Sequence, residues 1–263
     1  LIANFWLRPG NVHSANNVLQ FLESTLAHLA DKTVGLLRAD SGFFDDAFLS
    51  ALEFKHIPYI VAAKLTHPLQ RAIYQTRNWW ALKQGIEIAE IEYQAAVWKK
   101  ARRIIVIRQS VSDREPPGKS LSLFPDDPAA KSWRYSALVT DLALPAVEVW
   151  RIYRGRADAE NRIKELKADF GLDAFNMREF WATEAALSFA MLAYNLMSLF
   201  RQAVMRTPVK HTLSTLHGMV LAVGGAWKGG AGNNHLLLSV PRRKRAWFSG
   251  LWANATCLPR GAT

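Results

Sequence analysis

Short apolar runs and amphipathic segments alternate over residues 16–65 of the chain. Apolar residues at helical spacing predict helices over residues 16–31 and 45–56. The apolar runs at residues 33–40 and 57–65 have the composition of buried parallel strands. A strand, a helix and a second strand in this order form a βαβ unit, so the pattern predicts an α/β fold.

The residues before this unit, Leu1–Leu7, have an apolar pattern typical of the end of a strand. Because the chain opens in the middle of this pattern, we expect that its natural N-terminus is missing.

A period of two residues dominates the middle of the chain. Residues 86–98, 101–111 and 132–142 are predicted strands, and antiparallel pairing suits them better than a βαβ arrangement. The segment 112–132 is rich in Pro, Ser, Gly and Asp, so it predicts a long hairpin loop. Together these segments predict a β-rich insertion at about residues 76–143 within the α/β domain.

After Pro145 the apolar period changes to 3.6 residues. The pattern predicts one long helix over residues 145–171, with Pro145 in its first turn, and a second, apolar helix over residues 179–205. We therefore expect the core domain to span residues 1–205.

The remaining residues, 206–263, are predicted to form a basic extension of helix and strand. Residues 224–234 are rich in glycine and predict a flexible turn. Residues 241–248, with the sequence PRRKRAWF, could bind phosphate and stack on bases, or form a solvated basic turn.

The charge of the chain indicates the class of its partner. Its 263 residues include 33 Lys and Arg and 22 Asp and Glu, which gives a formal net charge of +11. This surplus favours nucleic acid over an inert basic surface. The single cysteine excludes an intrachain disulfide framework, and the sequence has no uncharged apolar run long enough to span a membrane. We expect an intracellular protein.

Two acidic residues are candidates for chemistry. Asp40 follows the predicted strand at residues 33–40, and functional groups collect at the carboxyl ends of strands in α/β sheets. The alternative is that Asp40 caps the following helix. Glu160 lies in a segment rich in Arg and Lys. It could be a metal ligand, or it could form an ordinary helical ion pair with Lys164.

The spacing Tyr153-x2-Arg156-x3-Glu160-x6-Lys167 resembles the Tyr-Arg-Glu-Lys signature of bacterial insertion-sequence transposases of the DDE class. At helical spacing these four side chains would fall on or near one face of the predicted long helix.

Two further segments resemble the same family. RADSGF, residues 38–43, is similar to the segment that contains the second catalytic aspartate, and LRPGN, residues 7–11, is similar to the strand and turn that precede it. The resemblance covers residues 1–205 and implies an RNase H-like core, in which helices flank a mixed sheet.

The resemblance also implies a mechanism and a set of roles. Asp40 would be the second catalytic acid and Glu160 the third, and together they would bind Mg²⁺ or Mn²⁺ for attack on DNA phosphodiesters. The remaining positions would contact DNA: Tyr153, Arg156, Lys164 and Lys167. The expected partners are duplex DNA with terminal inverted repeats, target DNA and a second copy of the chain in a synaptic dimer. The expected location is the bacterial cytoplasm, at the nucleoid.

Aromatic residues of the predicted insertion could also contact DNA. Related insertions stack an aromatic side chain on a base flipped from a DNA hairpin, which Trp98 or Trp133 could do. Packing in the core or on the sheet is the alternative for each of them.

No residue of this sequence matches the first catalytic aspartate of the family, because Asp31 follows a predicted helix rather than a strand. The chain is therefore expected to be a fragment or a decayed copy, and to be inactive in transposition by itself. Three other functions stay open: a related nuclease without strand transfer, a DNA-binding transposase remnant without catalysis, and a basic structural protein.

Overall fold

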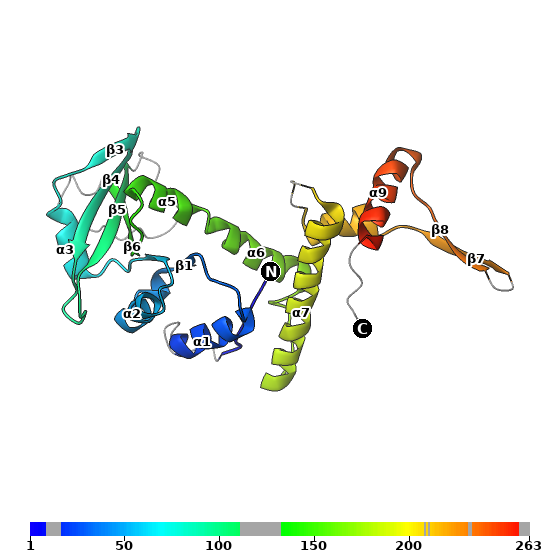
Figure 1. The fold of residues 1–263 in the computed structure, drawn as a ribbon, viewed down its shortest axis with the longest axis horizontal. Helices are drawn as coiled ribbons and strands as arrows, with labels where there is room; N and C mark the ends of the chain where they lie inside the picture. The colour runs from blue at the N-terminus through cyan, green and yellow to red at the C-terminus, as the bar shows by residue number, and fades with distance from the viewer. Residues whose placement is uncertain (9–16, 111–132, 208, 210, 231–232, 258–263) are drawn as a thin grey trace. The chain divides into compact units, whose positions relative to one another are not determined.

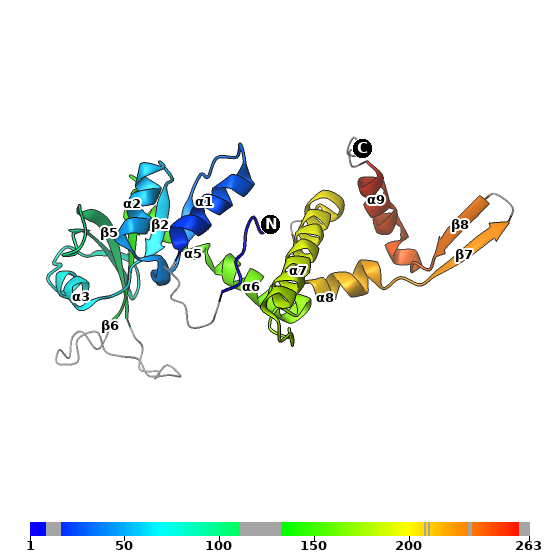
Figure 2. The same ribbon diagram turned by 90° about the horizontal axis from the view of Figure 1, so that it is seen from below.

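The computed structural model describes residues 1–8, 17–110, 133–207, 209, 211–230 and 233–257, and Figures 1 and 2 show its ribbon. The chain forms two compact units. We call residues 6–157 the sheet unit, and residues 1–5 with 158–263 the helical unit. Each is described by itself.

A six-stranded mixed sheet forms the sheet unit, with the strand order β1-β2-β6-β5-β4-β3. Strands β1 and β2 are parallel, as the βαβ pattern predicts, and the other neighbours are antiparallel. The strands are β1 Leu37–Ala39, β2 Tyr59–Ala62, β3 Trp80–Lys83, β4 Ile86–Tyr93, β5 Arg102–Ser110 and β6 Trp133–Thr140. The predicted α/β class is thus confirmed. The predicted β-rich insertion continues the same sheet, because β6 pairs directly with β2.

Helices cover both faces of this sheet (Figure 2). Strand β5 shows why, since alternate residues of its apolar run point to opposite cores. Ile104 and Val106 face the core that holds three helices: α1 Val18–Leu29, α2 Asp46–Phe54 and α3 His67–Tyr74. Ile105 and Ile107 face the core that holds α5 Ala146–Arg154.

The helical unit is built from helices and a hairpin (Figure 1). Its elements are α6 Ala157–Phe170, which begins at the unit boundary, α7 Phe180–Phe200, α8 Leu213–Leu216, β7 Gly225–Gly230, β8 Asn233–Leu238 and α9 Arg245–Thr256. A small core contains Val204, Met205, Leu216 and Leu251. Buried Glu165 accepts a hydrogen bond from Arg201 at 2.5 Å, which ties α6 to the end of α7. Within the described residues, no helix has the length and hydropathy needed to cross a bilayer.

The prediction of one long helix over residues 145–171 is wrong. Helix α5 ends at Arg154, and α6 begins at Ala157. Glycine has a low helix propensity, and at this point the amide of Arg156 bonds to the carbonyl of Tyr153, three residues back. A Cβ on Gly155 would lie 2.9 Å from a guanidinium nitrogen of Arg38, so the close approach of that side chain uses the glycine.

Two smaller predictions are corrected by the structure. Leu1–Leu7 is not a strand. The backbone of Ile2 bonds instead to the side chain of Asn195, with its amide donating at 2.7 Å and its carbonyl accepting at 2.9 Å. The Gly-rich segment forms strand β7, because Trp227 and Lys228 pair with β8.

The basic segment at residues 241–248 forms a 3₁₀ turn, Arg242–Lys244, which agrees with the predicted turn, and its remaining residues from Arg245 onward begin α9. The predicted hairpin loop at residues 112–132 lies outside the described residues.

Candidate active site

Asp40 follows the last residue of β1 and is exposed. Its Oδ1 accepts a hydrogen bond from the amide of Gly42 at 2.9 Å, so Asp40 caps the 3₁₀ turn Ser41–Phe43. Helix α2 has a different cap, since Asp45 Oδ1 accepts from the amide of Phe48 at 3.1 Å. Asp40 therefore lies at the end of a strand and also caps the short turn. The amide of Gly42 orients its exposed carboxylate.

The first two residues of the Tyr-Arg-Glu-Lys spacing lie beside Asp40. The hydroxyl of Tyr153 donates to the carbonyl of Ala39, the neighbour of Asp40, at 3.3 Å. The same hydroxyl accepts a hydrogen bond from Nε of Arg156 at 3.1 Å. The end of α5 thus brings a phenol and a guanidinium to the carboxyl end of β1, where sheet proteins place functional groups.

Arg38 adds a second link between β1 and α5. Its guanidinium donates to the carbonyl of Ile152 at 2.7 Å and occupies the space beside Gly155. It satisfies a carbonyl at the end of α5, where a cation also suits the helix dipole. Sequence reasoning assigned Arg38 no role, because nothing in RADSGF indicates which helix its side chain would reach.

The other residues of the spacing lie on α6, in the helical unit. Glu160, Lys164 and Lys167 are all exposed. They follow one another at intervals of four and three residues, so they share one face of α6. The prediction that Tyr153 and Arg156 belong to that same helical face is wrong, because the helix is interrupted at Gly155.

Trp98 is part of the sheet-unit core. It is 6% exposed, and its ring meets Phe44 and Tyr93 edge-on, with centroids 5.2 and 5.7 Å apart. The guanidinium of Arg102 lies 4.8 Å from the ring centroid. In this structure Trp98 packs in the core, which is the alternative to base stacking. A side chain this buried has no face open to a flipped base.

Trp133 is half-buried on the sheet, at the first residue of β6. The guanidinium of Arg108 lies 4.6 Å from the Trp133 ring centroid and 4.1 Å from that of Trp79. Arg108 also forms an ion pair with Glu87 at 2.5 Å. Base stacking by Trp133 stays a prediction, and Arg108 contacts its ring already.

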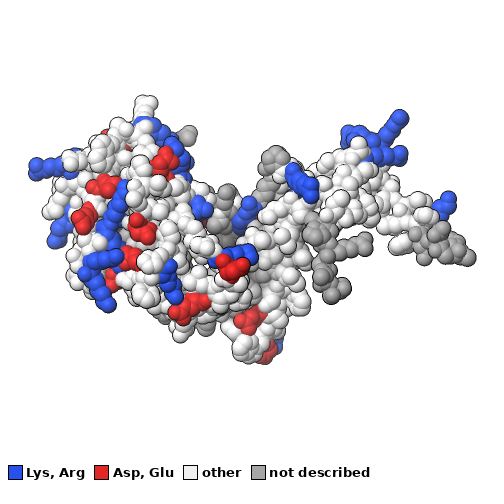
Figure 3. Space-filling view, viewed as in Figure 1, with Lys and Arg blue, Asp and Glu red and all other residues white. Residues whose placement is uncertain are grey.

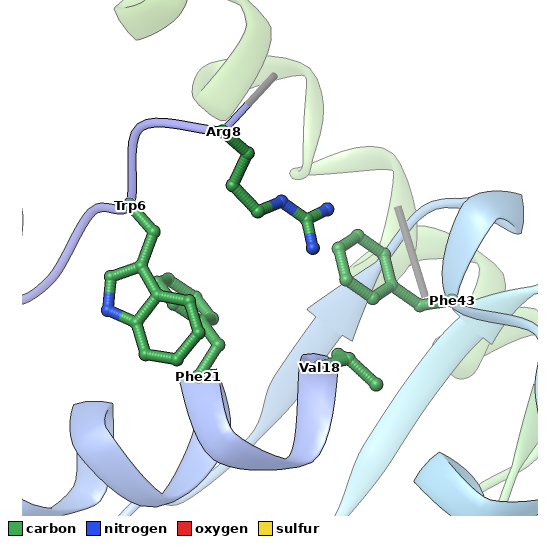
Figure 4. A pocket seen from close by; sticks show the side chains of 5 residues that line it. All are labelled: Trp6, Arg8, Val18, Phe21 and Phe43. Atoms are coloured by element: carbon green, nitrogen blue, oxygen red, sulfur yellow. The ribbon is translucent and has the colours of Figure 1, made fainter. Parts of the chain in front are cut away.

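A cavity of about 170 Å³ opens beside the turn that carries Asp40 (Figure 4). Its walls are Trp6, Arg8, Val18, Phe21 and Phe43. Trp6 meets Phe21 edge-on with centroids 5.3 Å apart, and the guanidinium of Arg8 points toward the ring of Phe43. Aromatic walls with one cation suit a flat ring next to negative charge. Sequence reasoning missed this cavity, because LRPGN had been assigned only to a strand and a turn.

Carboxylates are the relevant donors for a divalent metal, since Mg²⁺ and Mn²⁺ prefer oxygen ligands. Asp40 and Glu160 fit this preference in kind, and both are exposed. Among the residues that the structure describes, however, no three His, Cys, Asp or Glu side chains group as a metal site would require. The carboxylates of Asp40 and Glu160 are therefore suitable ligands for Mg²⁺ or Mn²⁺. They are two acids, however, and the family resemblance implies three.

A sequence model of a protein family, described as transposase DDE domain group 1, matches residues 2–240, which is most of the chain. The chain belongs to this transposase family. No match to it is found among curated proteins. Membership of the DDE transposase family implies DNA as the substrate and, for the family in general, dependence on a divalent metal. The matched range includes β1, the end of α5 and the first turns of α6.

Removing the hydroxyl of Tyr153 tests its link to the end of β1. We expect Tyr153→Phe to destabilise the sheet unit by about 1 kcal/mol or less, because it removes the hydrogen bond that links α5 to β1 and the bond that Arg156 donates to the same hydroxyl. Amide hydrogen exchange should also become faster at Gly42 and Phe43, whose amides bond to Asp40, the neighbour of Ala39. Tyr93→Phe is the control, since it removes a hydroxyl elsewhere in the same unit. Equal exchange changes in both variants would contradict the link.

Proposed function

We propose that the chain acts in the transposition of a bacterial insertion sequence, by metal-dependent cleavage of phosphodiesters at transposon ends and strand transfer. The observation that carries the proposal is the position of Tyr153 and Arg156, whose side chains meet at the end of β1 beside Asp40. Membership of the transposase family supports it. We further propose that the mixed sheet is an RNase H-like core and that residues 1–205 form the catalytic domain, with residues 206–263 as an extension.

In this proposal Asp40 and Glu160 are the metal ligands, for Mg²⁺ or Mn²⁺. A bound metal would stabilise the negative charge that develops on the attacking and leaving oxygens. The amide of Gly42 holds one oxygen of Asp40 and so restricts the carboxylate before any ligand binds. Preorganisation of this kind reduces the cost of orienting the group during the reaction.

The cationic residues of the same segments would hold the DNA. Arg156 is positioned by the Tyr153 hydroxyl, and a guanidinium can bind a phosphate with two parallel hydrogen bonds. Lys164 and Lys167 share a face of α6 with Glu160 and would bind phosphates next to the scissile bond. Tyr153 would contact the DNA backbone or orient a terminal phosphate.

With two assigned acids rather than three, we expect the 263-residue chain to bind metal weakly and not to complete strand transfer by itself. We propose that it acts in the bacterial cytoplasm, at the nucleoid, as a dimer that brings two transposon ends together. The rival proposals are a hydrolytic nuclease that ignores transposon ends, and a transposase remnant that binds DNA without catalysis.

Binding to the terminal inverted repeats that flank the gene of this protein tests the proposal. In a gel-shift assay we expect a duplex carrying one repeat to be bound more tightly than a shuffled duplex of equal length. End-labelled DNA incubated with Mn²⁺ then reports cleavage. A nuclease would cut both duplexes alike.

A remnant that only binds DNA would show the same affinity for the repeat with and without Mn²⁺, and Glu160→Gln would leave that affinity unchanged. Equal binding of the repeat and shuffled duplexes, without any response to Mn²⁺, would overturn the transposase proposal for this chain.

A further inference from the structure

The positive charge of the protein is concentrated in its last third. Residues 185–263 contain nine Lys and Arg and no Asp or Glu, whereas residues 1–184 contain 24 Lys and Arg against 22 Asp and Glu. Nine of the eleven net charges therefore come from a segment that contains α8, the β7–β8 hairpin and α9. The segment that carries the proposed catalytic residues is almost balanced in charge.

Four consecutive bases, Arg242, Arg243, Lys244 and Arg245, form the centre of this charge. They occupy a 3₁₀ turn and the first residue of α9, and three of the four are exposed while Lys244 is half-buried. Figure 3 shows Lys and Arg side chains gathered over this part of the helical unit, with no acidic side chain beside them on that face. We call these four residues the basic turn.

The backbone holds the basic turn in a fixed shape. The amide of Lys244 bonds to the carbonyl of Pro241 at 2.8 Å, and Nε of Arg245 donates to the carbonyl of Val240 at 3.2 Å. Pro241 also fixes one backbone angle at the start of the turn. The cations are thus presented together on an ordered element, as direct binding of phosphate groups requires.

This position is unfavourable for the free protein. The start of a helix carries partial positive charge, so acidic residues stabilise it and each nearby cation destabilises it. Mutual repulsion among four adjacent cations adds to that cost. Residues that destabilise the folded protein locally are expected at binding sites. Here a bound polyanion would reduce the repulsion among the four cations.

Aromatic side chains extend the same surface. Trp252 is 61% exposed and lies seven residues after Arg245, which places both on one face of α9. On the hairpin, exposed Lys228 lies opposite exposed His235 and adds one further cation to the helical unit. Phosphate contacts from such cations supply affinity that does not depend on base sequence.

We propose that the basic turn is a second DNA-binding surface, which binds phosphates of duplex DNA without metal and without the catalytic carboxylates. This inference rests on the proposed function in one respect only, namely that the bound polyanion is DNA. A surface of this kind would keep the protein on DNA during the search for its ends, because contacts to phosphate supply affinity that does not depend on sequence. An anionic membrane would also attract basic and aromatic residues. Duplex DNA is favoured because the four cations are concentrated in one turn and do not follow one face of an amphipathic helix.

The test compares two variants of the whole chain that lose the same charge. One carries Arg242→Gln, Arg243→Gln and Lys244→Gln. The matched control carries Lys55→Gln, Lys83→Gln and Lys99→Gln, three exposed residues of the sheet unit. Fluorescence anisotropy with a labelled duplex of arbitrary sequence, without metal, gives Kd at KCl concentrations between about 50 and 200 mM.

We expect the basic-turn variant to bind about tenfold or more weakly at the lowest salt. The slope of log K against log salt should fall by about one for each lost phosphate contact, hence by about three. The control variant should change Kd by less than about threefold, since its lysines make only long-range contributions. Equal losses in the two variants, or an unchanged slope, would overturn the proposal.

Two further measurements separate this inference from the proposed function. Adding Mn²⁺ should leave the loss caused by the basic-turn substitutions unchanged, so a failure of the catalytic proposal would not affect the result. In a flotation assay, vesicles of anionic phospholipid should not retain the protein in the presence of duplex DNA. Retention by the vesicles, together with weak duplex binding, would overturn the assignment to DNA.

Discussion

Replacing Asp40 with Asn, or Glu160 with Gln, is expected to weaken Mn²⁺ binding by about tenfold or more, because the number of charged oxygen ligands sets the affinity of such sites. Each substitution keeps the size of the side chain and removes one negative charge. In Asp40→Asn the side-chain carbonyl would still accept a hydrogen bond from the amide of Gly42, so the turn at Ser41–Phe43 should remain intact. The expected loss therefore reports on charge and coordination and not on folding.

The measurement is the broadening of backbone amide resonances by Mn²⁺, which detects weak sites and needs no catalytic turnover. In the unmodified chain we expect broadening at Gly42, whose amide bonds to Asp40, and in the first turns of α6 around Glu160. If both carboxylates serve one metal-dependent reaction, either substitution should reduce the broadening of both groups of resonances.

Asp31→Asn is the matched control, because Asp31 is exposed and follows α1 rather than a strand of the sheet. It should leave the Mn²⁺ titration unchanged. Broadening that persists at Gly42 in Asp40→Asn, or that is centred on other acids such as Asp46 and Glu53, would contradict the assignment of Asp40 as a ligand.

The fold could be predicted where the apolar pattern of a segment matches a single type of secondary structure. Residues 104–107 of the predicted strand 101–111 are continuously apolar, and the structure places this strand inside the sheet, with Ile104 and Ile105 in different cores. The apolar spacing does not predict the break at Gly155, because the spacing continues through it. The low helix propensity of glycine marks a weak point there, and only the structure shows that Arg38 approaches it from another element. Tertiary contacts decide such points, and periodicity does not report them.

The candidate site was predicted in part for the same reason. A signature of four residue types selected Tyr153 and Arg156, and the structure adds what the spacing lacks, namely the bonds that join them to each other and to Ala39. Trp98 shows the limit of composition. From the sequence, an aromatic residue in a strand-rich segment could equally stack on a base or pack in a core. The 6% exposure of Trp98 in the structure favours packing.

Arg102 illustrates a residue whose importance the sequence does not signal. It stands in a strand with other arginines, yet its side chain is 2% exposed. Its Nε donates to Glu53 at 2.8 Å, and its two terminal nitrogens donate to Asp46 at 2.6 Å and to Ser50 at 2.9 Å. Both carboxylates belong to α2, so this network joins α2 to β5 across the core.

We expect Arg102→Met to lower the free energy of unfolding of the sheet unit by about 3 kcal/mol, because removing one partner leaves two acids in a poorly hydrated position. This loss lies at the lower end of the range expected when a buried ion pair loses one partner, because the side chains of Glu53 and Asp46 remain 15% and 18% exposed. Lys100→Met is the control. Lys100 is 3.0 Å from the same Glu53 but 58% exposed, so its loss should cost less than about 1 kcal/mol.

The difference between Arg102→Met and the unmodified chain should depend on pH. Burial alone raises the pKa of Glu53, but hydrogen bonds from Arg102, Lys100 and Tyr59 outweigh it, and the pKa lies below its ordinary value of 4.5. A carboxyl whose pKa is lower in the folded state contributes stability above the unfolded pKa and loses it as pH falls through the folded value. The destabilisation should therefore be largest near neutral pH and should shrink as the pH falls below about 4.5.

Hydrogen exchange of peptides from α2 and β5 as a function of urea concentration measures this stability locally, which suits a chain of two compact units. If Arg102→Met fails to fold, Arg102→Lys serves instead. It keeps the charge but cannot reach Glu53, Asp46 and Ser50 together, so it should be less stable than the unmodified chain and show the same pH trend. A loss no larger than that of Lys100→Met, or one independent of pH, would show that the network does not hold α2 to the sheet.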